Sequence, residues 1–187
     1  MPPKVKITKE NIVKAAVEIV RTEGVQAINA RTVASALNCS TQPIFSNFAT
    51  MEELRYAVML YAHKRSQEYM QQEIASGKYP PYKASGMSYI RFAKEEKELF
   101  QLLYMHDQAK ESLGENAEEL FDQMKDLVQD YTGLQDAHAQ LFHLEMWICV
   151  HGIATMFATG YLDLDWDLVS KILSDTYMGL RKQYHLE

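Results

Sequence analysis

Apolar residues recur at spacings of three and four along the whole chain, and no segment keeps alternating between apolar and polar residues. This pattern is typical of amphipathic α-helices and predicts an all-α protein. Helices are expected over residues 9–22, 30–37, a short segment after 40, 50 to beyond 61, 83–94, 96–106, 116–131, 135–159 and 166–183.

The first helices carry start and stop signals. Thr8 and Asn29 stand where N-caps of the first two helices are expected, and Gly24 ends the first helix. Thr50 and Glu53, three residues apart, form the pattern of a capping box, in which each side chain satisfies a backbone amide of the other. These signals predict a compact N-terminal unit.

Residues 31–48 have the layout of two helices that cross at a tight turn. Asn38 tolerates the left-handed backbone that such a turn requires, and Ser40 is expected to cap the next helix. Ile44 and Phe48, four residues apart, are expected to face the core. Short polar side chains are left facing outward, where they can meet base edges in a DNA major groove. A helix-turn-helix is the interpretation that fits this arrangement.

Residues 11–54 are similar to the N-terminal domain of the tetracycline-repressor (TetR) family. The matching positions are Gly24, Val33-Ala34, Ser40, Ile44-Phe45, Phe48 and Met51-Glu52-Glu53-Leu54. The rest of the chain resembles the family in its helix lengths and in Trp147, His151 and Gly152. The resemblance implies a three-helix helix-turn-helix DNA-binding domain (residues 1–54) joined to a larger α-helical ligand-binding and dimerisation domain (residues 55–187).

The resemblance also implies a homodimeric repressor that a small apolar or aromatic effector releases from a palindromic operator in double-stranded DNA. In the family, certain residues of the helix-turn-helix approach bases and others contact phosphate. The positions that match the base-approaching residues are Thr41, Gln42, Pro43 and Ser46, and those that match the phosphate contacts are Arg31, Phe45, Asn47 and Met51.

Three residues depart from the family pattern. Phe45 stands where tyrosine is usual, so a phosphate-binding hydroxyl is absent, although the ring can still meet a thymine methyl. Met51 replaces a common lysine and removes a positive charge. Gln42 stands where glycine is frequent and adds a side chain able to pair with adenine.

Charge is divided unevenly along the chain, whose formal net charge is −6. Residues 1–50 carry six basic and three acidic residues, whereas the remainder carries an acidic excess. A basic head and an acidic body suit a protein that binds a polyanion through one end. We therefore expect Lys4, Lys6 and Lys9 to join Arg31 in contacting phosphate.

The long helix near residues 141–157 has two apolar faces. One face carries Leu141, Leu144, Ile148 and Thr155, and the other carries Phe142, Met146, Cys149, Ile153 and Phe157. Two faces suggest two partners, the body of its own subunit and the matching helix of a second subunit. The residues expected at this dimer interface are Ile148, Gly152, Thr155, Thr159, Val169, Leu173 and Tyr177. The alternative is a core formed wholly within one chain.

Methionine and aromatic side chains suit an adaptable apolar pocket. The candidate effector-binding residues are Phe100, Tyr104, Met105, Phe121, Phe142, Met146 and Cys149. Such side chains more often belong to an ordinary core, and the C-terminal domain would then bind a protein partner or no ligand.

Several function classes lack their sequence patterns. The histidines have no metal-ligand spacing, and neither a nucleophile elbow nor a phosphate-binding glycine loop is present, so we expect no metal, no cofactor and no enzyme. No run of 18 apolar residues and no secretory signal occurs, and Cys39 and Cys149 are widely separated. These features favour a cytoplasmic protein without a membrane partner.

Overall fold

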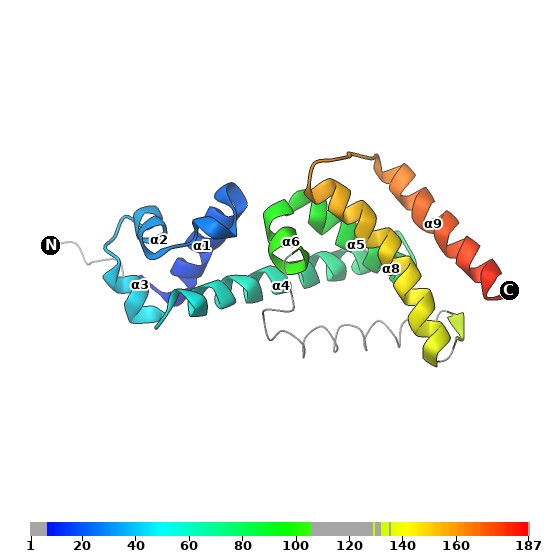
Figure 1. Ribbon diagram of the computed structural model, residues 1–187, viewed down its shortest axis with the longest axis horizontal. Helices are drawn as coiled ribbons and strands as arrows, with labels where there is room; N and C mark the ends of the chain where they lie inside the picture. The colour runs from blue at the N-terminus through cyan, green and yellow to red at the C-terminus, as the bar shows by residue number, and fades with distance from the viewer. Residues whose placement is uncertain (1–6, 106–128, 130–131, 135, 187) are drawn as a thin grey trace. The chain divides into compact units, whose positions relative to one another are not determined.

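The computed structural model describes residues 7–105, 129, 132–134 and 136–186. Its elements are α1 (Lys9–Glu23), the 3-10 turn η1 (Val25–Ala27), α2 (Ala30–Ala36), α3 (Gln42–Asn47), α4 (Met51–Ala75), α5 (Pro81–Glu95), α6 (Lys97–Tyr104), α8 (Asp136–Ala158) and α9 (Trp166–Gln183) (Figure 1). These residues contain no strand, so the all-α prediction is confirmed. The helix expected over residues 116–131 lies outside the described residues except for residue 129.

The expected caps start the first two helices. The Thr8 hydroxyl accepts a hydrogen bond from the Asn11 amide at 3.2 Å. The Asn29 carboxamide accepts from the amides of Arg31 (3.0 Å) and Thr32 (3.1 Å). Each bond satisfies a helix-end amide that has no partner within the helix.

Two predicted caps differ from the structure. Ser40 lies one residue too early, because α3 begins at Gln42 with Thr41 in the N-cap position, and no side-chain bond caps this helix. At the start of α4 the Glu53 amide donates to the Thr50 hydroxyl as expected (3.1 Å), but the Glu53 carboxylate accepts from the Ala49 amide instead of the Thr50 amide (2.7 Å).

The chain divides into two compact units. Unit 1 comprises residues 1–67 and 96–105, and unit 2 comprises residues 68–95 and 106–187. The boundary predicted between residues 54 and 55 falls inside α4, which continues to Ala75. It stays a prediction.

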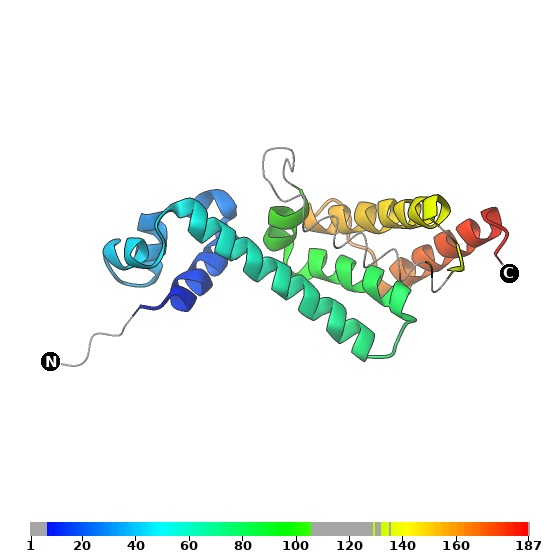
Figure 2. The ribbon, with the colours of Figure 1, turned by 90° about the horizontal axis from the view of Figure 1, so that it is seen from below.

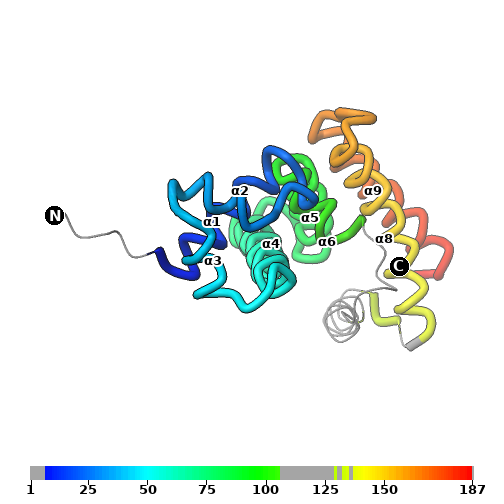
Figure 3. Tube along the Cα trace, turned by 60° about the vertical axis from the view of Figure 1, so that its left-hand side comes forward, coloured from blue at the N-terminus to red at the C-terminus, as the bar shows by residue number. Residues whose placement is uncertain are grey.

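The core of unit 1 is formed by apolar faces of short helices. On α1 the expected stripe of Ile12, Ala16, Ile19 and Val20 is buried. This helix packs against α2 and α6, and Figure 3 shows α1, α2 and α3 gathered around the beginning of α4. Because the core residues alternate with polar ones at helical spacing, one face of each helix remains available to solvent.

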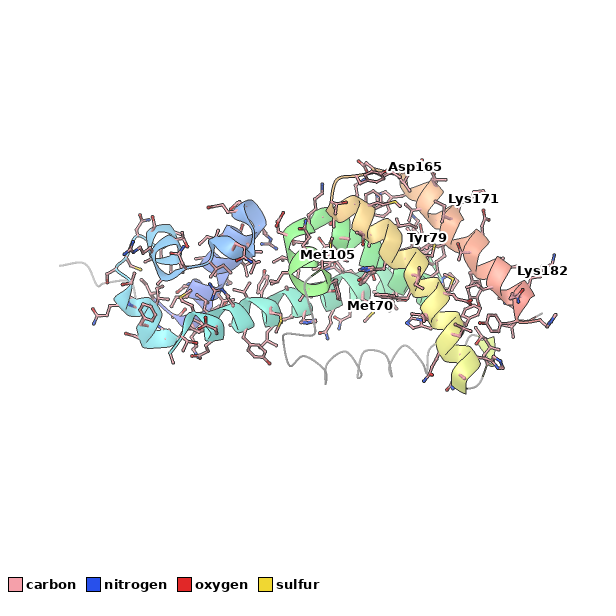
Figure 4. The ribbon with its side chains drawn as sticks, in the orientation of Figure 1. Met70, Tyr79, Met105, Asp165, Lys171 and Lys182 are labelled. Carbon is pink, nitrogen blue, oxygen red and sulfur yellow. The ribbon has the colours of Figure 1, made fainter. Side chains whose placement is uncertain are left out.

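Unit 2 is built on α5, α8 and α9. Helix α8 packs against both α5 and α9 (Figures 1 and 2). Gly86 permits the close approach of α5, since a Cβ at this position would lie 3.2 Å from Cγ2 of Val150. A lysine of α5 also reaches α9: Lys83 Nζ donates to the hydroxyls of Ser170 and Ser174, both at 2.8 Å, and lies over the ring of Tyr79, which Figure 4 labels.

Over Ala137–Ala158, α8 is long and apolar enough to cross a membrane by length and composition alone. Burial accounts for one face of this helix. Phe142, Ala154 and Phe157 are at most 3% exposed and contribute to the core of unit 2.

Candidate functional site

The turn between α2 and α3 is fixed by a short hydrogen-bonded motif. Asn38 has a φ of 51°, the left-handed conformation predicted for it. Its amide donates to the Ser35 carbonyl (3.0 Å), and the Cys39 amide donates to the Ala34 carbonyl (2.9 Å). These two bonds make a Schellman motif, which ends α2 and sends the chain sharply into the next helix.

Helix α3 is held by one apolar face. Ile44 is fully buried and Phe48, just past the helix end, is 2% exposed, so both predicted core positions are confirmed. The opposite face carries Gln42, Phe45 and Ser46, all exposed, at the spacings of three and four that place residues side by side on a helix. Phe45 is 53% exposed, a large proportion for an aromatic ring.

Some polar groups on α3 are already engaged by the helix itself. The Ser46 hydroxyl donates to the Gln42 carbonyl (2.9 Å), and the Asn47 amide nitrogen donates to the Pro43 carbonyl (2.8 Å). Thr41 and Asn47 are half-buried, whereas the Gln42 side chain is exposed. The predicted base-reading residues therefore share one end of unit 1 but differ in the hydrogen-bonding groups that they can offer.

Arg31 is the single charged residue between Asn29 and Thr50. It lies in the first turn of α2 and is exposed. Its side chain makes no hydrogen bond or ion pair with any residue that the structure describes. The guanidinium is thus available to an anion such as a DNA phosphate.

Lys9 has a partner within its own unit. Its Nζ lies 2.9 Å from Oε1 of Glu53 and 4.9 Å from the centre of the Phe48 ring. The bond from Lys9 is the largest cause that lowers the pKa of Glu53, followed by the bond from the Ala49 amide. Lys4 and Lys6, the other lysines of the predicted arm, lie outside the described residues.

The sequence does not indicate the structural contact that Arg55 makes near the start of α4. Arg55 Nη2 donates to the Ile28 carbonyl (3.0 Å), and Nη1 lies 3.2 Å from Glu52. The bond to the Ile28 carbonyl joins α4 to the segment that leads into α2. The two residues are 27 positions apart, so no local pattern in the sequence signals the contact.

The two predicted faces of α8 differ in burial as expected. Phe142, Met146 and Ile153 are buried, whereas Leu141 and Ile148 are 47% and 59% exposed. The exposed face continues past Gly152, where a Cβ would meet nothing within 4 Å. This is an apolar surface with room for close approach.

Two threonines extend that face, and their hydroxyl groups donate hydrogen bonds within α8 itself. The Thr155 hydroxyl donates to the His151 carbonyl and the Thr159 hydroxyl to the Thr155 carbonyl, both at 2.7 Å. Their hydrogens are therefore satisfied within α8. Among the residues of α9 expected at the dimer interface, Val169 and Leu173 are buried in their own unit and offer no surface, whereas Tyr177 is half-buried.

The candidate effector-binding residues fall into two groups. Phe100 and Tyr104 lie on α6 in unit 1, with ring centres 5.1 Å apart, and Met105, labelled in Figure 4, follows them and is 40% exposed. Phe142, Met146 and Cys149 lie on α8 in unit 2. Phe121 lies outside the described residues.

Phe142 and Met146 of unit 2 belong to an aromatic cluster with a buried polar pair. Phe142 and Met146 pack with Tyr82, and the ring of Tyr177 stands edge-on to Phe142 at 5.7 Å. The Tyr82 hydroxyl and Nδ1 of His143 are 3.2 Å apart. Burial raises the pKa of Tyr82 and lowers the pKa of His143, so both groups are neutral at pH 7.

Comparison with known proteins adds two findings. Residues 82–173 match the family described as "Tetracyclin repressor-like, C-terminal domain". No curated protein is similar enough to the chain to count as a match.

Solved structures share the fold over nearly the whole chain. A TetR-like transcriptional regulator from Rhodococcus sp. RHA1 is 15% identical, with a TM-score of 0.72 over 98% of each chain. A TetR family member from Streptomyces coelicolor A3 is 17% identical, with a TM-score of 0.67 over 90% of this chain and 96% of its own. The multidrug binding protein EbrR, complexed with imidazole, is 16% identical, with a TM-score of 0.62 over 90% of this chain and 88% of its own.

Proposed function

We propose that this protein is a homodimeric transcriptional repressor that a small-molecule effector releases from a palindromic operator. Two findings support this: residues 82–173 match the tetracyclin repressor-like C-terminal domain, and the chain is similar in fold to TetR-like regulators. Residues 1–54 would bind DNA and residues 55–187 would bind the effector and the second subunit. The protein would act in the cytoplasm by binding alone, without catalysis.

The observation that carries the proposal is the exposed face of α3 behind a tight Schellman turn. The turn fixes the direction of a short helix whose inner residue Ile44 is buried and whose outer residues Gln42, Phe45 and Ser46 are exposed. A helix presented in this way fits the major groove of B-DNA, which is about 12 Å wide. Arg31 would bind phosphate at the edge of the same surface.

A selection from random duplex DNA with the purified full-length protein tests the proposal. We expect enrichment of a palindrome whose half-sites are separated by about one helical turn, 10–10.5 base pairs. Failure to enrich any sequence would contradict DNA-binding regulation. Binding of a single, non-repeated half-site would contradict the dimeric mode.

The salt dependence of binding to the selected operator identifies the phosphate contacts. Each neutralised phosphate contributes roughly −0.9 to the slope of log affinity against log salt concentration. We expect Arg31→Ala to reduce the magnitude of the slope by about 1.8, the contribution of one phosphate from each subunit. Lys182→Ala, an exposed change near the end of α9 (Figure 4), should leave the slope unaltered.

The outer face of α8 supports the homodimer. Leu141, Leu144 and Ile148 are exposed at helical spacing on one surface, and isolated monomers rarely leave such a stripe uncovered. The same stripe on a second copy would cover it through a two-fold interface, in which identical patches meet. Leu168 and Met178, 41% and 61% exposed on α9, would extend the apolar area.

The aromatic cluster around Phe142 supports an effector site in unit 2. Adaptable methionine and aromatic side chains surround the buried Tyr82 and His143, which are uncharged and able to hydrogen-bond. The similarity to EbrR, whose structure contains imidazole, agrees with an effector of small aromatic type. An effector that binds the DNA-free shape about 1,000-fold more tightly supplies about 4 kcal/mol for release.

A further inference from the structure

We infer that α3 reads its operator through an adenine and a neighbouring thymine methyl, with Gln42 and Phe45 as the two residues that determine sequence specificity. The inference rests on the proposed function, because it names the bases that the proposed DNA-binding surface recognises. It follows from the chemical groups that the folded helix leaves available.

Hydrogen-bond donors on α3 are the first constraint. The Ser46 hydroxyl hydrogen and one N–H of Asn47 are bonded to carbonyls of the preceding turn. Ser46 can still accept a hydrogen bond, and Asn47 is half-buried. Gln42 is the residue of α3 whose whole carboxamide, with its paired donor and acceptor, faces outward. A carboxamide matches N6 and N7 of adenine in a bidentate pair.

The absence of basic side chains from α3 is the second constraint on the bases that it can read. Guanine is most often read by arginine or lysine, which donate two hydrogen bonds to O6 and N7. No basic residue occurs between Arg31 and Arg55, a span that includes the turn, all of α3 and the start of α4. Arg31 lies at the start of α2, before the turn. The outer face of α3 is therefore without the usual guanine-reading group.

Phe45 supplies the third constraint. Its ring is 53% exposed and shares a face of α3 with Gln42, one turn earlier. A phenyl ring offers no hydrogen bond to a phosphate or to a base edge. In the major groove the apolar group available to it is the C5 methyl of thymine. Since residues at i and i+3 are neighbours on a helix, the two bases are expected within adjacent base pairs.

The test removes single groups from the selected operator. Replacing thymine by uracil deletes only the methyl group, and replacing adenine by 7-deazaadenine deletes only the N7 acceptor. Affinity is measured by fluorescence anisotropy for the full-length protein and for Phe45→Ala, Gln42→Ala and Tyr161→Ala. Tyr161 is 80% exposed between α8 and α9 and serves as the matched control for loss of an exposed aromatic ring.

We expect one uracil substitution in each half-site to weaken binding of the unmodified protein by about 3- to 4-fold per half-site, the effect of burying one methyl group. Phe45→Ala should bind the thymine and uracil operators equally, whereas Tyr161→Ala should keep the difference. The deaza substitution should weaken binding by about 5-fold or more and lose its effect in Gln42→Ala. Thermal melting checks that each variant remains folded, which its exposed position favours.

The outcomes separate this inference from the proposed function. An enriched palindrome whose affinity is insensitive to uracil at every thymine, or equally sensitive in Phe45→Ala, would overturn the role of Phe45. A palindrome specified by guanines alone would overturn the whole reading scheme while leaving DNA-binding regulation intact. A selection that enriches nothing would overturn the proposed function itself.

Discussion

Asn38 occupies a backbone conformation that most residues avoid. With φ at 51°, it brings Cβ close to the following carbonyl oxygen, which costs an ordinary L-residue roughly 1–2 kcal/mol. Asparagine reduces this cost and glycine removes it. The direction of α3, and with it the placement of Gln42 and Phe45, depends on this one conformation.

Substitutions at Asn38 test that dependence. Asn38→Ala should lower the free energy of unfolding by about 1 kcal/mol, whereas Asn38→Gly should change it by only a few tenths. Urea unfolding measures both values, and operator binding should weaken in the alanine variant alone. Equal effects of alanine and glycine would contradict a backbone origin.

His143 gives a prediction about pH. It is 8% exposed, and burial lowers its pKa below the ordinary value of about 6.5. Well above pH 6.5 both folded and unfolded chains hold it neutral. As the pH falls, the unfolded chain takes up a proton first, so stability is lost until the pH passes the pKa of the folded state.

We therefore expect the free energy of unfolding to fall between pH 7.5 and 5.5, with a contribution from His143 of at most about 1.4 kcal/mol per pH unit. His143→Gln should show a shallower fall over the same range. His151, whose pKa burial also lowers, supplies a second contribution that persists in this variant. An unchanged pH dependence in His143→Gln would show that this imidazole does not titrate differently on unfolding.

Local signals explain why much of unit 1 was predictable at the residue scale. Thr8, Asn29 and Asn38 act through bonds to backbone groups no more than three residues away, and a sequence displays such spacings directly. The N-cap of α3 was predicted at Ser40, but the neighbouring Thr41, which is equally suitable, takes this position without a side-chain bond. Neighbouring hydroxyls give the sequence no means of choosing between them.

Among the elements, α1 and α6 are joined by a buried ion pair. Glu96, just after α5, accepts two hydrogen bonds from Arg21, at 2.6 and 2.8 Å, and Arg65 Nε lies 3.4 Å from the same carboxylate. The side chain of Glu96 is 9% exposed, and that of Arg21 is 27% exposed. The bond to Glu96 is the largest cause that raises the pKa of Arg21.

Removing this carboxylate charge should destabilise unit 1. We expect Glu96→Gln to lower the free energy of unfolding by about 2 kcal/mol, less than a fully buried pair because both arginines reach solvent. Glu18→Gln removes the exposed partner of the same arginine and should cost less than about 1 kcal/mol. Chemical denaturation of the two variants supplies the comparison. Equal losses would contradict the dominance of the buried bond.

A sequence reveals which face of a helix is buried, but it does not reveal which distant charged residues pair. The two faces of α8 were predictable because burial follows the helical repeat. The Arg21–Glu96 and Lys9–Glu53 pairs join positions 75 and 44 residues apart, and many other charged residues were equally plausible partners. The expected contact of Lys9 with DNA stays a prediction, and the structure adds Glu53 as a partner of Lys9 within its own unit. Val169 and Leu173 lie on a predictable apolar stripe, but only the packing of α9 shows that its own unit covers them.

At the scale of the whole molecule, dimerisation should control DNA affinity. Ile148→Glu places a charge at the most exposed large apolar position of the α8 face, and burying that charge at a two-fold interface is strongly unfavourable. We expect a monomer in light scattering and a loss of operator affinity of about 100-fold or more. In a dimer the second DNA-binding domain binds its half-site intramolecularly once the first is bound, and a monomer loses this advantage.

Gln67→Glu adds the same charge at an exposed position of α4 and should leave both the mass and the affinity unchanged. An Ile148→Glu protein that remains dimeric would remove the α8 face from the interface.

Arg31 is the single charged residue between Asn29 and Thr50, and this affects how α3 and its turn bind DNA at the salt concentrations of the cell. Non-specific attraction to chromosomal DNA comes from phosphate neutralisation, and it weakens steeply as intracellular ion concentrations rise. A protein that relies on base contacts made by uncharged groups is held only loosely at wrong sequences. We expect the part of the operator affinity that α3 contributes to vary little when the cell gains or loses salt during osmotic stress, whereas the part that depends on Arg31 and on the predicted lysine arm should fall as salt rises.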